Sequence, residues 1–254
     1  MYGVESRTAA GPQATHSRQA KLGGMDRRAL LSNVSIFAPL GEREIDQLVE
    51  LTTTRRLKAK EVLFRKGDPG NQLYGVMSGK LKVVTTGADG KELVFGVMSQ
   101  GDVIGDIAIA DSNPRSASVV ALEPSELLTL HRREFIPYLE RHPKVAIQLA
   151  GVLAGRVRKL SEKAEDSIFL PLPARMAKTL LALAPSYGGA SALDQPVDIR
   201  LAQQDLGDML GTTRESVNKQ LRAWEEGGLV ALHRGRLTLL SRESLGAIAD
   251  LTHL

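Results

Sequence analysis

The stretch GDVIGDIAIADSNPRSASV (101–119) places Arg115 beside Ser116 in a polar turn between two short apolar runs. A guanidinium offers paired donors to phosphate oxygens, and a hydroxyl and backbone N–H groups add directed donors. Asp106 lies in the same stretch, and Gly105 before it allows the backbone to approach a ligand closely. These residues predict a phosphate-binding turn. The simpler interpretation is a solvated turn in which Arg115 pairs with a structural carboxylate such as Asp106.

A second set of polar side chains lies in TTRESVNKQLRAW (212–224). Arginine pairs bidentately with guanine, glutamate accepts from cytosine, and lysine or arginine binds phosphates. Arg236, and Arg234 before it, fall in a predicted β-hairpin that adds phosphate contacts as a wing. The pattern predicts a DNA-reading surface, and a helical hairpin with a solvated charged face is the simpler interpretation. The residues expected to face outward are Thr213, Arg214, Glu215, Asn218, Lys219 and Arg222.

Two helices joined by a short turn must position this second set. Gly211 is placed to end the first helix, and Thr212 or Thr213 to cap the second. Residues 170–254 carry nine Lys and Arg and nine Asp and Glu, so charge does not decide between the two interpretations. The apolar spacing and the cap predict a helix-turn-helix. The residues expected to be buried are Leu206, Met209 and Leu210 on the first helix, and Val217, Leu221 and Trp224 on the second.

Short β-branched runs from Arg55 onward must position the first set. Turn sequences GDPGN, SGK, GADGK and SQGD break these runs, and turns at such regular spacing predict an antiparallel sandwich or barrel. The strands continue through Ser118–Val120 and Glu126–Leu130. Before them, the apolar spacing over residues 41–54 predicts a short helix.

One long helix is predicted over residues 143–169. Its apolar stripe would have nowhere to bury itself in one small domain, so a twin helix from a second subunit is expected, the alternative being a stripe packed on its own domain. Two prolines in Leu170–Pro173 end the helix and predict a hinge. The stripe residues are Val145, Leu149, Val152, Arg156, Leu160 and Ala164.

Composition limits the function classes. The 254 residues contain no cysteine, which excludes disulfides, thiol catalysis and iron–sulfur clusters and fits a cytoplasmic protein. No membrane span, signal peptide, metal-ligand spacing, P-loop lysine or catalytic pair is recognisable, so neither an enzyme nor a metal site is expected. Residues 1–24 are predicted to be a disordered tail, with Met25 as a possible native start.

Over about residues 30–240 the chain resembles the bacterial cyclic AMP receptor protein/FNR (CRP/FNR) transcription regulators. GDVIGDIA…PRSASV is similar to the phosphate-binding cassette of cyclic-nucleotide domains, and TTRESVNKQL is similar to the family's recognition helix. The resemblance implies an α+β chain. Its parts would be a jelly-roll-like cyclic-nucleotide-binding β-roll (25–142), a dimerisation helix (143–169) and a winged helix-turn-helix (170–254).

The resemblance also implies residue roles. Arg115 would pair with the exocyclic oxygens of a cyclic phosphate, and Ser116 and the N–H groups around Ile107–Ala108, after Gly105, would donate to it. The family's glutamate on the ribose 2′-hydroxyl is Asp106 here, which has a shorter reach. The family's base-contacting pair falls on Leu160, which has no hydroxyl, and on Ser161, which can bond a purine edge across the dimer.

The resemblance implies a homodimeric transcription regulator that binds a palindromic operator under the control of a cyclic nucleotide. Cyclic AMP is the first choice, with cyclic GMP and cyclic di-GMP as alternatives. Contact with RNA polymerase is implied through the Tyr187–Pro196 loop. Two alternatives stay open: a DNA-binding regulator of this family with a relic pocket, and a nucleotide-sensing module that binds no DNA. None of the five histidines falls in the predicted sheet core, so haem sensing is not expected.

Overall fold

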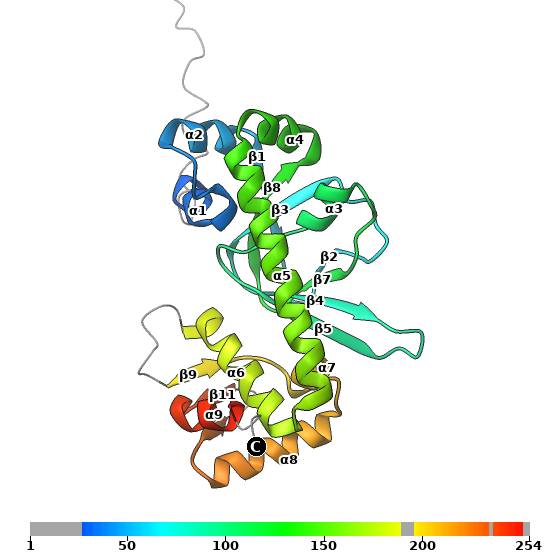
Figure 1. The fold of residues 1–254 in the computed structure, drawn as a ribbon, viewed down its shortest axis with the longest axis vertical. Helices are drawn as coiled ribbons and strands as arrows, with labels where there is room; N and C mark the ends of the chain where they lie inside the picture. Colours follow the sequence, from blue (N-terminus) through cyan, green and yellow to red (C-terminus); the bar gives the residue numbers. More distant parts are fainter. Residues whose placement is uncertain (1–26, 189–195, 234–235, 251–254) are drawn as a thin grey trace, which may run out of the picture.

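The computed structural model describes residues 27–188, 196–233 and 236–250. The predicted tail, the Met25 start and Arg234 lie outside the described residues. An N-terminal β domain and a C-terminal helical domain are joined by one long helix, which runs beside the sheets to the second domain (Figure 1). None of the helices in the described ranges is long and apolar enough to span a membrane.

Three short helical elements precede the sheets: α1 (Arg27–Asn33), a 3-10 turn (Ser35–Phe37) and α2 (Glu42–Glu50). The prediction of a helix over 41–54 is wrong at its end, because α2 stops at Glu50. Thr52–Thr54 are β-branched and pair with the strand at Leu128–Leu130, so they start β1 instead. Ile45 and Leu48 of α2 are buried, so the helical spacing itself was interpreted correctly.

Two four-stranded antiparallel sheets form the N-terminal domain and confirm the predicted sandwich. Val76, Leu81 and Leu127 are fully buried between them. One sheet has the order β1 (Thr52–Leu57), β8 (Ser125–His131), β3 (Gln72–Ser78) and β6 (Val103–Ile104). The other has the order β2 (Val62–Phe64), β7 (Ser118–Ala121), β4 (Leu81–Thr86) and β5 (Glu92–Met98).

A short helix, α3 (Asp106–Asp111), lies between β6 and β7, where the sequence predicted only a turn. Gly105 precedes it with φ 86°, and Ser112 ends it with φ 61°. Ala108 and Ile109 of the IAIA run pack inward, which a single turn of helix achieves over this length.

The helices α4 (Arg132–Arg141) and α5 (Pro143–Phe169) follow the sheets. Val145 and Leu149 of the predicted stripe are buried against Phe37, Phe135 and the rest of the N-terminal core. We expected the whole stripe to pack against the helix of a second subunit, and this expectation is wrong for the first two turns of the helix. These turns have a partner in their own domain.

The C-terminal domain begins after a connector of two residues, Leu170 and Pro171, in the predicted hinge segment. Its core gathers Met176, Leu180, Leu221 and Trp224. The predicted helix-turn-helix and hairpin are confirmed, and β9 and α9 are additional elements that the sequence did not predict. The order is α6 (Leu172–Gly188), β9 (Val197–Ile199), α7 (Gln203–Leu210), α8 (Arg214–Glu226), β10 (Val230–His233), β11 (Arg236–Leu239) and α9 (Arg242–Ala249).

Candidate functional site

Arg115 is buried just before β7, with 4% of its surface exposed. Its Nη1 donates to the Gly105 carbonyl at 3.1 Å and its Nη2 to the Gln72 carbonyl at 2.6 Å. The guanidinium carbon also lies 4.2 Å from the centroid of the Phe64 ring. These contacts orient the side chain with neutral groups, and Nε has no hydrogen-bond partner among the described residues. The cation is therefore available to an anion.

The solvated-turn interpretation assumed that Arg115 pairs with a carboxylate such as Asp106. In the structure Arg115 donates to two backbone carbonyls instead. Burial lowers the pKa of Arg115 from its ordinary value, and Tyr74, Asp106 and Asp68 partly oppose this effect. The guanidinium nevertheless stays protonated, as arginine does in proteins.

Gly105 brings the backbone against this guanidinium. A Cβ at position 105 would lie 2.3 Å from Arg115 Nη1 and 3.0 Å from the Gln72 carbonyl oxygen. The φ of 86° also belongs to the left-handed region that favours glycine. Any side chain here would displace the arginine from its carbonyls.

Asp106 is paired with Arg156, which the sequence placed in the stripe of the long helix and not at the ligand site. Arg156 of α5 donates from Nη1 to Asp106 Oδ1 at 2.6 Å and from Nη2 to the Val103 carbonyl. Asp106 is 1% exposed, and its Oδ2 has no partner within the described ranges. Burial raises the pKa of Asp106, although Arg156 opposes the shift. Arg156 was missed because its position fits the apolar stripe. The signal that identifies it is a charge at a stripe position.

A small cavity of about 60 Å³ gathers most of the predicted ligand residues. Phe64, Val83, Met98 and Arg156 also line it, and none of these four was predicted to contact a ligand. Leu160 and Ser161 do not line it in one protomer: Leu160 is half exposed, and Ser161 Oγ donates to the Val157 carbonyl of its own helix at 3.1 Å. The predicted residues on the cavity are Gly105, Asp106, Ile107, Ala108, Arg115 and Ser116.

The helix-turn-helix is held by its turn. Gly211 has φ 63° after α7, and the Thr213 hydroxyl caps α8 by accepting from the Ser216 N–H at 3.2 Å. A Cβ on Gly207 would lie 2.9 Å from the Thr212 carbonyl oxygen, so glycine lets α7 approach the turn. Val217 and Trp224 of α8 are buried.

The predicted DNA-contacting residues lie on the outer side of α8 and on the hairpin. Arg214, Asn218, Arg222 and Arg236 line an open cleft of about 670 Å³ between α8, β10 and β11. Gln203 and Gln204, at the start of α7, line it too and were not predicted. Thr213, Glu215 and Lys219 are exposed on α8 outside the lining of this cleft.

Comparison with known proteins matches a family domain to each of the two parts of the chain. Residues 54–142 match the family model of the cyclic nucleotide-binding domain, and residues 174–248 match that of the Crp-like helix-turn-helix domain. A cyclic AMP receptor protein of Thermus thermophilus is 32% identical over 214 residues, which cover 84% of this chain and 96% of the relative.

Two further comparisons extend this result. A CRP-like cAMP-activated global transcriptional regulator of Mycobacterium tuberculosis is 29% identical, covering 84% of this chain and 94% of the relative. The solved structure of the c-di-GMP responsive global regulator CLP of Xanthomonas campestris shares the fold, with a TM-score of 0.67 at 21% identity over 79% of this chain and 100% of that one. The named relatives are regulators and not enzymes. The chain belongs to the CRP/FNR family of transcription regulators, with a cyclic-nucleotide-binding domain and a DNA-binding helix-turn-helix.

Proposed function

We propose that this regulator acts as a homodimer whose DNA binding is controlled by a cyclic nucleotide, with cyclic AMP as the first choice. The observation that carries the proposal is the buried Arg115 at the cavity wall, which two backbone carbonyls hold and which pairs with no carboxylate of the described residues. Two relatives of this chain are named for cyclic AMP, which favours that nucleotide. The similar structure titled for c-di-GMP keeps cyclic di-GMP as an alternative, and cyclic GMP is the other alternative.

The charges at the cavity suit one cyclic phosphate. Arg115 and Arg156 contribute two positive charges and Asp106 one negative charge, which leaves one net positive charge. A cyclic phosphodiester carries a single negative charge, so a bound ligand would neutralise the site. Burying a phosphate requires a fixed cation and directed donors, which Arg115, Ser116 and the N–H groups of Ile107 and Ala108 would supply.

The size of the cavity links ligand binding to α5. A volume of about 60 Å³ holds only a few water molecules. A nucleoside phosphate therefore requires the lining residues, Arg156 among them, to move apart, while Asp106 Oδ2, which has no partner within the described ranges, could accept from a ribose hydroxyl. Because Arg156 stands on α5, the ligand and the position of this helix are coupled.

The homodimer would form along α5. A second stripe at alternating spacings of three and four residues is exposed along this helix: Ile147, Ala150, Ala154, Val157, Ser161, Ala164 and Ile168. Such a repeat is the seam of a two-stranded coiled coil. It differs from the stripe predicted from the sequence, but it includes Ser161, which would then face the partner's ligand. Successive major grooves lie about 34 Å apart, so the two recognition helices of the dimer must match that separation.

Calorimetry with cyclic AMP, cyclic GMP and cyclic di-GMP tests the ligand. Wild type is expected to bind cyclic AMP most tightly, and Arg115→Ala to lose at least about a hundredfold in affinity, because charge-assisted hydrogen bonds to a buried phosphate are lost. Ser116→Ala is expected to lose less. Arg132→Ala is the matched control, since Arg132 bonds Ile109 and Ser112 outside the cavity lining.

Absence of heat with all three nucleotides would contradict the ligand and favour a regulator with a relic pocket. Equal affinity for Arg115→Ala and wild type would contradict the role of Arg115. Contact with RNA polymerase stays a prediction, because residues 189–195 of the expected loop lie outside the described residues.

A further inference from the structure

The β4–β5 hairpin is the place where the N-terminal domain contacts the helix-turn-helix. Lys82 Nζ on β4 donates to Asp205 Oδ1 on α7 at 2.7 Å, and to Glu92 Oε2 on β5 at 3.0 Å. The side chains of Lys82 and Asp205 are only 15% and 14% exposed. Solvent therefore screens this pair less than an ordinary surface pair. Val97 of β5 packs beside it on the core of the C-terminal domain.

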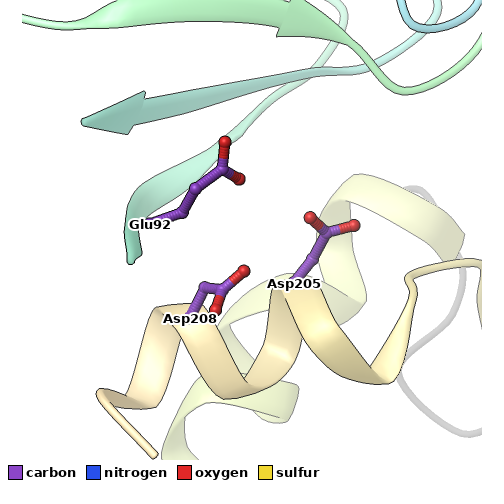
Figure 2. A group of neighbouring side chains, drawn as sticks. All are labelled: Glu92, Asp205 and Asp208. Carbon is purple, nitrogen blue, oxygen red and sulfur yellow. The ribbon is translucent and has the colours of Figure 1, made fainter. Parts of the chain in front are cut away.

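Three carboxylates gather at this contact, as Figure 2 shows for Glu92, Asp205 and Asp208. The group already has a cation, because Lys82 bonds two of the three, and Gln204 Nε2 donates to Asp208 at 2.8 Å. Burial by itself would lower the pKa of Lys82, but its hydrogen bonds to Asp205 and Glu92 outweigh that effect and raise it. The ammonium is thus charged at neutral pH and ties two domains together.

A second contact lies near the first. Lys80 Nζ stands 4.7 Å from the ring centroid of Tyr187 on α6 and pairs with Glu123 at 3.1 Å. Burial raises the pKa of Tyr187 to about 12, with Glu123 and Asp205 adding to the shift. Lys80, just before β4, therefore contacts α6, and Lys82 on β4 contacts α7.

The same hairpin also forms a wall of the effector cavity. Val83 and Met98 line that cavity, and they are the immediate neighbours of Lys82 and Val97 in the chain. Successive side chains of a strand point to opposite faces, so each strand contacts the cavity with one residue and the C-terminal domain with the next. A displacement of the hairpin at the cavity must move its other face.

We propose that the Lys82–Asp205 pair is an interdomain latch that fixes α7 to the β4–β5 hairpin and transmits effector occupancy to the helix-turn-helix. The transmission of effector occupancy rests on the proposed function. The ion pair that forms the latch is present in the protein without a nucleotide and does not depend on that proposal. Because Gly207 of α7 packs closely on the Thr212 carbonyl in the turn before α8, a fixed α7 also fixes the orientation of α8.

Hydrogen–deuterium exchange on the full chain without nucleotide tests the latch. Lys82→Gln and Asp205→Asn are each expected to speed amide exchange in both α7 and β5 by about tenfold, since each removes the ion pair between the hairpin and α7. The swap Lys82→Asp with Asp205→Lys is expected to restore slow exchange. Lys91→Gln is the matched control: it lies on the same hairpin, and both it and its partner Asp89 are exposed.

Equal exchange in Lys82→Gln and Lys91→Gln overturns the latch, as does failure of the swap to restore protection. A second measurement compares affinity for a palindromic DNA fragment with and without cyclic AMP. The ratio of the two affinities is expected to fall toward one in Lys82→Gln and to stay at the wild-type value in Lys91→Gln, and an unchanged ratio in Lys82→Gln overturns the transmission. If wild type binds no nucleotide, the proposed function fails while the exchange experiment still decides on the latch.

Discussion

Arg156 is a charged side chain directly after an apolar turn of α5, VLAG (152–155), and its guanidinium reaches a carboxylate in the N-terminal domain. Asp106 is almost fully buried, whereas Arg156 keeps 30% of its side chain exposed. The pair therefore lies between the buried and the surface class of ion pair. Its removal affects stability in a way that depends on pH.

We expect Arg156→Ala to lower the free energy of unfolding by about 2 kcal/mol near neutral pH, because the buried Asp106 carboxylate loses its partner. Burial raises the folded-state pKa of Asp106, and without Arg156 only the backbone hydrogen bonds from Asp106 and Ile107 oppose that shift. Burying the ionised carboxylate therefore lowers the free energy of unfolding of the variant by the full amount when the pH is above this pKa. When the pH is below the unfolded-state pKa of about 4, the carboxyl is protonated in both states and the loss disappears. Urea denaturation followed by circular dichroism at several pH values measures it.

The difference between Arg156→Ala and wild type should shrink as the pH falls from about 7.5 toward about 4. A difference that is constant with pH would contradict the role of Asp106. Arg158→Ala on the same helix is the control, since Arg158 is exposed.

The sequence predicted Arg115 and its neighbours because one short stretch contains them. It did not predict the environment of Arg115. Phe64 and Gln72 reach the guanidinium from distant strands, and Arg156 comes from a helix that lies 50 residues after Asp106 in the chain. Contacts between segments so far apart depend on how the sheets and α5 pack, which local spacing does not report.

At the scale of elements, α8 depends on its N-terminal cap. Thr213 Oγ1 accepts from the Ser216 N–H, which satisfies one of the donors left free in the first turn. Trp224 lies on the same helix, is buried and is the single tryptophan of the chain. Its fluorescence therefore reports on the unfolding of the C-terminal domain.

Thr213→Ala is expected to destabilise that domain by about 1 kcal/mol, the usual cost of a lost cap. Denaturation followed by Trp224 fluorescence measures this change. Thr212→Ala is the neighbouring control and should have a smaller effect, because Thr213 provides the cap. Equal effects of the two substitutions would show that the cap bond is not what stabilises α8.

Elements whose own residues specify them, through a cap or an apolar face, were predicted from the sequence. Strands that form because they pair with a distant strand were not. Helix α8 combines a cap, an apolar face and a preceding glycine, and the structure has it as expected. Thr52–Thr54 were assigned to a helix, although their β-branched side chains pair with β8. Strand β9 has only three residues and exists because Val197 and Ile199 pair with β11.

At the scale of the whole molecule, the proposed homodimer rests on the exposed seam of α5. Ile147, Val157 and Ile168 are 71%, 63% and 74% exposed, which leaves large apolar side chains in water along one face of the protomer. The sequence contained both stripes of this helix. The spacing alone did not distinguish the stripe that packs on its own domain from the one left for a partner.

Val157→Glu is expected to weaken the dimer by at least about a hundredfold, because two carboxylates would be buried against each other at the seam. Sedimentation equilibrium of the full chain measures the dissociation constant. Lys159→Glu introduces the same residue about half a turn away on the same exposed helix and should leave the dimer intact. If Val157→Glu remains a dimer, another surface must join the subunits.

The short connector at Leu170 and Pro171 has a kinematic consequence. Proline fixes one backbone torsion, so few soft torsions remain between α5 and α6. A body attached at one point swings in every direction, whereas a body attached at two points rotates only about the line between them. The connector is one such point and the group of contacts around Lys82–Asp205 is the other, so the C-terminal domain would turn about a single axis. The recognition helix α8 would then move along a single arc. Breaking the ion pair would weaken the second attachment, and the domain could then rotate about the connector in more than one direction.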